Sequence, residues 1–317
     1  MGKIFQRIKH LLNGSEIVIF HEFHKPPYGG GNQFLIALEK ELIKLGVDVG
    51  RNTIGRNTKA CLFNSFNFDA EKLLKLRNKY KMRMVHRLAG PIGVYRGTDI
   101  EVDRDTQKLN ERLADATVFI SNYSANKYKD LGLNYKNPTV IVNSTDSEIF
   151  NSLCRITDPD GARRIKLIAT AWSNNPKKGG PLLSWLDEHL DHSKYELTFV
   201  GRTKAVFKGA RIIDPVPSDE LAKILKQHDI YIAPSEDDPC SNALIEALAS
   251  GLPTAYLSSG GHPELVGEAG EGFTDGPTAL EAIEKIANNI PGYRAKISIS
   301  SMQNVAKEYL RVLTSNT

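Results

Sequence analysis

The chain has 317 residues, about twice the length of a single α/β domain, so we expect two domains of roughly 150 residues each. Hydrophobic residues make up 41% and charged residues 25%, which excludes disordered, collagen-like and coiled-coil classes. The sequence holds no apolar run of about eighteen residues and no secretory signal, so we expect no membrane span. A net charge of +4 is too mild for a dedicated nucleic-acid binder, and three scattered cysteines favour a cytoplasmic setting.

Short β-rich runs alternate with helix-period runs in the first half of the chain. Strands are predicted at residues 17–20, 61–63, 82–86, 117–120 and 139–142. Between the first two runs, residues 33–45 carry one apolar stripe and end at Gly46, which predicts a helix. Several strands are apolar throughout, as buried parallel strands are.

The alternation stops at the polar residues 151–164, which include Asp158-Pro159-Asp160-Gly161 and are typical of a linker, and then begins again. Strands are predicted at 165–171, 197–200, 212–213, 230–233 and 254–257, and helices at 182–190, 219–227, 242–249, 279–290 and 302–313. We therefore predict an α/β protein with two Rossmann-like, doubly wound domains, residues 1–155 and 156–300, that face a central cleft. Residues 301–317 are expected to pack back toward the first domain.

Two loops after predicted strands contain residues suited to an anionic ligand. Gly30 and Gly31 precede the first helix, where the backbone can approach a ligand closely, although a plain flexible loop would also account for them. In residues 233–253 an acidic loop leads into an amphipathic helix. There the amides of Asn242 and Ala243 can receive a diphosphate, between the carboxylates of Asp238 and Glu246.

This acidic segment resembles the retaining glycosyltransferases of family 4, which have the two-domain GT-B architecture. The match consists of Asp238, Glu246-Ala247 and the turn Ser250-Gly251-Leu252-Pro253, with Asp238 where the family has a first glutamate. The resemblance implies transfer of a sugar from a UDP- or GDP-linked donor to a glycan or lipid-linked acceptor, with retention of configuration. It implies no divalent metal and no other cofactor.

The resemblance also suggests roles for individual residues. Lys178, in Lys178-Gly179, would neutralise the departing diphosphate, and His86 would face the reacting sugar. Trp172 stands where the family has an arginine, and Arg202 is a candidate substitute.

Further roles concern the donor. Asp238 would bind the hydroxyls of the donor sugar, and Glu246 those of the ribose. Val216 would place backbone against the base, and Glu264 would lie on the sugar side.

Other patterns leave alternatives open. His21 and His24 have no third metal ligand nearby, and Asp103-Arg104-Asp105 is interpreted as the solvated face of a helix, so no metal site is predicted. Seven basic residues and no acidic one lie between Lys72 and Arg87, which fits a solvated surface or a peripheral membrane contact. Weakly in the same direction, residues 3–12 form an amphipathic stretch. The competing functions are a nucleotide-sugar epimerase of the same architecture and a catalytically silent nucleotide-sugar or glycan-binding protein.

Overall fold

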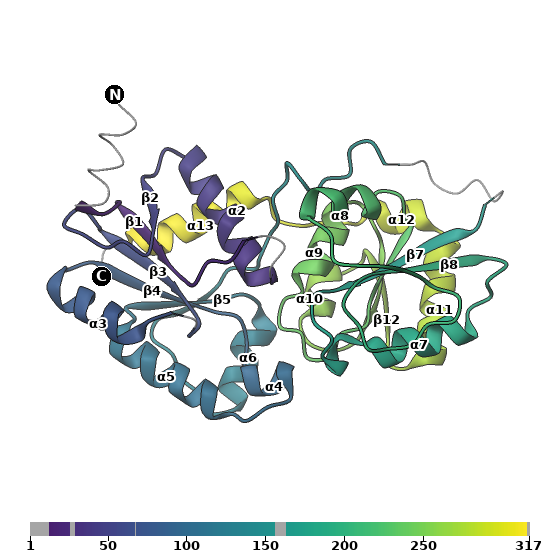
Figure 1. Cartoon of the computed structure of the whole chain (residues 1–317), viewed down its shortest axis with the longest axis horizontal. Coiled ribbons are helices and arrows are strands. Elements are labelled where there is room, and N and C mark those ends of the chain that lie inside the picture. The colour runs from purple at the N-terminus through teal and green to yellow at the C-terminus, as the bar shows by residue number, and fades with distance from the viewer. Residues whose placement is uncertain (1–12, 26–28, 67, 156–162, 316–317) are drawn as a thin grey trace.

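Figure 1 shows the computed structural model, which describes residues 13–25, 29–66, 68–155 and 163–315. The described chain forms two lobes, each built around one six-stranded sheet. Two predicted features, the amphipathic stretch 3–12 and the turn from Asp158 to Gly161, lie outside the described residues.

The first sheet is entirely parallel in the described chain, with strand order β2-β1-β3-β4-β5-β6. Its strands are β1 (Ile17–Phe20), β2 (Val49–Arg51), β3 (Ala60–Asn64), β4 (Arg83–Leu88), β5 (Ala116–Phe119) and β6 (Pro138–Val140). Alternate strand residues point to opposite faces. One face packs on α2 (Gly30–Lys44) and α13 (Met302–Thr314), and the other packs on α3 (Ala70–Lys79) and α5 (Glu101–Leu113). The short helices α4 (Ile92–Arg96) and α6 (Asn122–Asp130) follow β4 and β5.

The second sheet repeats this plan, with strand order β12-β11-β10-β7-β8-β9. Its strands are β7 (Ile165–Ala171), β8 (Tyr195–Gly201), β9 (Arg211–Ile213), β10 (Ile230–Ala233), β11 (Thr254–Leu257) and β12 (Gly270–Phe273). One face is covered by α8 (Ser218–Leu225), α9 (Asn242–Ala249) and α10 (His262–Val266). The other face is covered by α7 (Gly180–His189), α11 (Gly276–Ala287) and α12 (Ile290–Ala295). The predicted pair of doubly wound α/β domains is confirmed.

Two strands, β2 and β12, are absent from the sequence-based prediction. Both are short edge strands that contain glycine, a residue that is depleted in strands. Gly270 has a packing reason, because a Cβ atom there would lie 1.9 Å from the carbonyl oxygen of Thr254 on β11. Hydrophobic pattern alone therefore misses one of the two edge strands of each sheet.

The last helix, α13, belongs to the first lobe although it follows the second in sequence (Figure 1). Its buried residues Met302, Val305, Tyr309 and Leu313 join the core beneath α2, and the rings of Tyr309 and Phe34 lie 5.8 Å apart. The chain thus passes between the lobes twice, once before the strands of the second sheet in the sequence and once after them.

Candidate active site between the two domains

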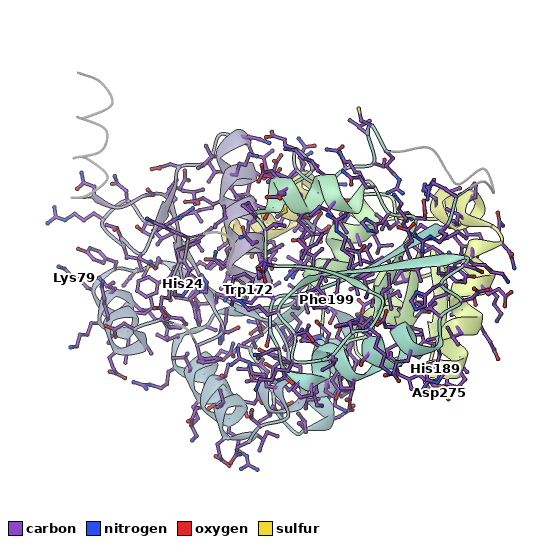
Figure 2. All side chains as sticks on the ribbon, turned by 45° about the vertical axis from the view of Figure 1, so that its right-hand side comes forward. His24, Lys79, Trp172, His189, Phe199 and Asp275 are labelled. Carbon is purple, nitrogen blue, oxygen red and sulfur yellow. The ribbon has the colours of Figure 1, made fainter. Side chains whose placement is uncertain are left out.

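A pocket of about 420 Å³ lies where the carboxyl ends of the two sheets meet. The first lobe contributes residues that follow β1, β3 and β4, and the second contributes residues that follow β7 and β10. Figure 2 labels His24 and Trp172, which line this pocket from the first and the second lobe respectively. Among the residues that the structure describes, the charged side chains that line it are three cations, Arg87, Arg96 and Lys178, and one carboxylate, Asp238. The net positive charge of these four side chains favours an anionic ligand.

Lys178 and Asp238 form an ion pair inside the pocket. Lys178 closes the 3₁₀ turn η1 (Pro176–Lys178) after β7, and Asp238 lies in the loop after β10. The Nζ atom of Lys178 lies 2.7 Å from Oδ2 of Asp238, whose side chain is nearly buried. Burial alone would raise the pKa of Asp238, but the adjacent Lys178 ammonium holds that pKa below its ordinary value. Asp238 is therefore an anion, fit to accept hydrogen bonds from hydroxyl groups.

The helix α9 begins beside this pair and presents unpaired amides to the pocket. Ser241 caps α9, since its hydroxyl accepts a hydrogen bond from the Leu244 amide. The amides of Asn242 and Ala243 have no acceptor in the part of the chain that the structure describes, and both residues line the pocket. Free amides and the helix dipole together favour a phosphate group at this position.

The predicted glycines meet this helix from the opposite lobe. Gly30 and Gly31 open α2 and line the pocket. A Cβ atom on Gly30 would lie 2.3 Å from Nδ2 of Asn242, whereas a Cβ atom on Gly31 would meet no atom within 4 Å. Gly30 is therefore required for the close approach of the two lobes, and Gly31 is not.

His86, for which a catalytic role was predicted, does not line the pocket. Its side chain is fully buried in the first lobe and stacks on Phe63 with 4.3 Å between ring centres. One ring nitrogen lies 2.7 Å from the carbonyl oxygen of Ser65, and the other lies 3.2 Å from Nδ2 of Asn110. Burial lowers the pKa of His86 to about 3, so the ring is neutral. This histidine serves the core of the domain.

Glu246 faces a second, smaller cavity of about 60 Å³ that shares Gly30 and Asn242 with the main pocket. Burial raises the pKa of Glu246 to about 8, so the carboxyl is largely protonated at neutral pH. Its carboxyl oxygens have no hydrogen-bond partner within the described ranges of the chain. A ribose contact for Glu246 therefore requires a ligand that extends from the main pocket into this side cavity. Val216 packs against the core of the second lobe and is not among the residues that line the main pocket.

The acidic pair around Arg104 is not a uniformly solvated face, which corrects that interpretation. Asp103 is fully buried, and its carboxylate accepts hydrogen bonds from the amides of Ile92 and Gly93 at 2.7 and 2.9 Å, so that it caps α4. Asp105 is exposed and pairs with Lys108. Among residues 13–25, 29–66, 68–155 and 163–315 no group of three His, Cys, Asp or Glu side chains could hold a metal ion.

Comparison with known proteins agrees with this geometry. Residues 180–289 match the family described as glycosyl transferases, group 1. The matched segment lies within the second lobe. A sulfoquinovosyl transferase of Arabidopsis thaliana is 34% identical over 70 residues, which are 22% of this chain and only 13% of that curated relative.

Solved structures of glycosyltransferases share the whole fold. Sucrose-phosphate synthase from Thermosynechococcus elongatus has a TM-score of 0.70 at 14% identity, over 94% of each chain. HepE from Anabaena, solved with UDP and glucose, has a TM-score of 0.67 at 14% identity, over 95% of this chain and 100% of that one. The catalytic domain of starch synthase IV from A. thaliana, bound to ADP and acarbose, has a TM-score of 0.71 at 11% identity, over 95% and 99% of the two chains. The expected GT-B architecture is confirmed.

Two further residues of the second lobe lie outside the main pocket. Arg202 lines a neighbouring pocket of about 470 Å³, and its guanidinium lies 4.3 Å from the ring centre of Trp172. Glu264, predicted on the sugar side, does not line the main pocket. Its carboxylate accepts hydrogen bonds from the amides of Asn122 and Tyr123 at the start of α6, and so joins the second lobe to the first.

The sequence analysis missed the polar residues with which the first lobe faces the second. His21 follows β1, Asn64 ends β3, Arg87 lies near the end of β4 and Asn143 follows β6, and all four line the pocket. A positional signal was present, because a polar residue at the carboxyl end of a buried parallel strand points to a binding crevice. Arg87 was instead counted in the basic run, a placement that its burial now corrects.

Proposed function

We propose that this chain transfers a sugar from a nucleotide diphosphate sugar to a hydroxyl group of a glycan or lipid-linked acceptor. One observation carries the proposal: the Lys178–Asp238 pair and the free amides that open α9 face one pocket between two lobes. This arrangement offers cationic and dipolar partners to a diphosphate, and an ionised carboxylate to the hydroxyls of the attached sugar. Similar proteins solved with UDP or UDP-glucose support a nucleotide sugar as donor.

The residues present support a retaining transfer that needs no divalent metal. As the donor bond breaks, negative charge develops on the diphosphate, where Lys178 and the α9 amides would stabilise it without a divalent metal. The departing diphosphate oxygen would help to take the proton of the acceptor hydroxyl as that hydroxyl attacks from the same face, which retains the configuration. Asp238 would hold the sugar hydroxyls during this step. The contact between Glu264 and α6 would help to keep the lobes closed and to exclude water.

Nucleotide release separates this function from its competitors. The purified chain is incubated with UDP-, GDP- and ADP-linked sugars, with and without a panel of glycan and lipid-linked acceptors. Slow release of nucleoside diphosphate that an acceptor accelerates supports the transferase. Interconversion of the nucleotide sugars without an acceptor supports an epimerase, and binding without turnover supports a silent binding protein. The anomeric configuration of the product tests retention, and a rate unchanged by a chelator tests independence of metal.

We also propose a peripheral membrane contact for the first lobe. Of the basic run, Arg87 is buried, Arg77 lies 3.4 Å from Asp115, and the half-buried Arg83 donates to the carbonyl oxygen of Val312 at 2.6 Å, so these three do not contribute a free surface charge. Four exposed lysines remain on and after α3: Lys72, Lys75, Lys79 and Lys81. Figure 2 shows Lys79 at the outer edge of the first lobe, away from Trp172. No helix in the described chain is long and apolar enough to cross a membrane, so any such contact would be made by the surface.

A further inference from the structure

Arg87 is a buried cation without a counter-ion. Its side chain is 1% exposed, and no carboxylate lies within salt-bridge distance of it in the described residues. Its two terminal nitrogens donate to Oδ1 of Asn64 at 2.7 Å and Oδ1 of Asn143 at 2.8 Å, while its Nε atom has no hydrogen-bond partner. The guanidinium also lies 4.4 Å from the ring centre of Phe34. Neutral amides satisfy hydrogen bonds but do not neutralise a charge, so this arrangement is costly unless an anion approaches.

Because of its position, Arg87 would attract an anion bound in the main pocket. Arg87 lines the main pocket from the first lobe, on the side opposite the Lys178–Asp238 pair of the second lobe. Nδ2 of Asn143, the amide that Arg87 holds, donates to Oδ1 of Asn242 at 3.1 Å. Asn242 is the first residue of α9, so one side-chain amide separates the guanidinium from the helix start. The unpaired charge and the unpaired amides therefore face the same space.

Arg87 also determines which atoms its neighbours present to the pocket. A guanidinium has only donors, so the oxygens of Asn64 and Asn143 turn toward it and their amide nitrogens turn away. Nδ2 of Asn64 lies 3.5 Å from Nδ1 of His21. Burial and the charge of Arg87 lower the pKa of His21 to about 4, so this ring is neutral and can accept. Each amide nitrogen keeps a second hydrogen, so the wall around Arg87 is a set of donors.

We propose that Arg87, with Asn64 and Asn143, forms an anion site on the wall of the first lobe that takes a phosphoryl group. The proposal rests on the proposed function for the identity of the main ligand. Two sources share this chemistry, the diphosphate of the donor and a phosphate carried by the acceptor. If the donor is the source, Arg87 would serve as the second cation that is missing from position 172, where a tryptophan stands.

An isosteric substitution tests the site without removing Arg87. Asn64→Asp places a carboxylate 2.7 Å from the guanidinium and gives the buried charge its counter-ion. We expect this variant to melt at a higher temperature than the wild type and yet to bind phosphoryl ligands at least tenfold more weakly. A purely structural role for Arg87 would not weaken binding in a more stable protein. Arg87→Gln should show the same loss of affinity, and the exposed Asn304→Asp on α13 adds the same charge elsewhere as a control.

The ligands distinguish the two sources by titration calorimetry. If the donor supplies the group, the affinity for UDP, GDP or ADP falls in Asn64→Asp while the affinity for the parent nucleoside does not. If the acceptor supplies it, nucleoside diphosphate affinity is unchanged, and inorganic phosphate binds the wild-type nucleotide complex but not that of the variant. Unchanged affinity for both ligands in folded Asn64→Asp overturns the site. Failure of the wild type to bind any nucleoside diphosphate overturns the proposed function instead, and phosphate binding to the free protein still tests Arg87.

Discussion

The ammonium of Lys178 and the carboxylate of Asp238 lie 2.7 Å apart and neutralise each other in the ligand-free cleft. A diphosphate that enters the cleft competes with Asp238 for Lys178, and a sugar hydroxyl that binds Asp238 relieves this competition. The pair thus couples recognition of the leaving group to recognition of the sugar, and the two members should respond to substitution in opposite directions.

Lys178→Gln should weaken nucleoside diphosphate binding about ten- to a hundredfold, because it removes a charge-assisted hydrogen bond. Asp238→Asn should strengthen binding of the same ligand, because it frees the ammonium, while it lowers the rate of sugar transfer. Fluorescence titration with UDP, GDP and ADP measures both changes. Lys177→Gln is the matched control, since Lys177 bonds to Asp237 and to the carbonyl of Val94 and does not line the pocket. Equal losses in the two lysine variants would reject a specific role for Lys178.

Gly30→Ala should impair closure of the lobes, and Gly31→Ala should not. The new methyl group at position 30 meets the Asn242 amide, whereas the methyl group at position 31 enters open space and favours the first turn of α2. We expect Gly30→Ala to lower kcat/KM at least tenfold and to increase the radius of gyration in small-angle scattering with nucleotide bound. Gly31→Ala should keep wild-type kinetics with a slightly raised Tm. Identical behaviour of the two variants would contradict the close contact.

Glu246 should make the ligand-free protein less stable as the pH rises. Its pKa is about 8 in the folded chain, against an ordinary value of 4.5. Between these values the folded chain holds a proton that the unfolded chain has lost, so the free energy of unfolding falls with rising pH. Glu246→Gln removes this dependence. Its gain in Tm over the wild type should be near zero at pH 4.5 and greatest above pH 8.

The exposed Glu281→Gln on α11 provides the baseline for this measurement. A Tm difference between Glu246→Gln and the wild type that stays constant from pH 4.5 to 8.5 would show that Glu246 is not buried as a neutral acid. The same variant tests the proposed ribose contact. If Glu246 holds the ribose hydroxyls, the wild type binds a nucleoside more tightly than its 2′,3′-dideoxy analogue, and Glu246→Gln reduces this difference.

His86→Gln should lower stability and spare turnover. The substitution loses the stacking on Phe63 and disturbs two buried hydrogen bonds, at a cost of about 2 kcal/mol in the free energy of unfolding. The kcat of the folded fraction should stay within about twofold of the wild type. Urea unfolding and initial rates on the same sample measure the two quantities. A hundredfold loss of kcat at unchanged stability would show that His86 takes part in the reaction.

Replacing Lys72, Lys75, Lys79 and Lys81 by glutamine should reduce binding to vesicles that contain phosphatidylserine. Each lysine near an anionic surface contributes about 1 kcal/mol, so the loss should be large at low salt and should vanish at high salt. Cosedimentation with vesicles measures it. Four exposed lysines elsewhere serve as control positions: Lys194, Lys208, Lys285 and Lys296. Equal losses in the two quadruple variants would indicate an effect of net charge alone.

Much of the fold and half of the site could be predicted from the sequence, for physical reasons. Apolar runs and helical stripes report burial directly, so ten of the strands were found, while the glycine-containing edges β2 and β12 were not. In the loop before α9, Asp238 and Asn242 are neighbours in sequence, so their proximity was predictable. His86 and Arg87 show the limit. They are adjacent in one strand and so point to opposite faces of its sheet. Only the structure shows that the arginine lines the pocket, while the histidine packs inside the first lobe.

The return of α13 to the first lobe imposes an order on biosynthesis. The core beneath α2 includes Met302, Val305 and Tyr309, so the lobe that is translated first cannot complete its interior until the lobe that is translated second has been made. A nascent chain that pauses after residue 300 would hold a finished second lobe beside an unfinished first lobe with an exposed apolar groove. Truncations that remove α13 would therefore damage the first lobe, although the second lobe is nearer to α13 in the sequence.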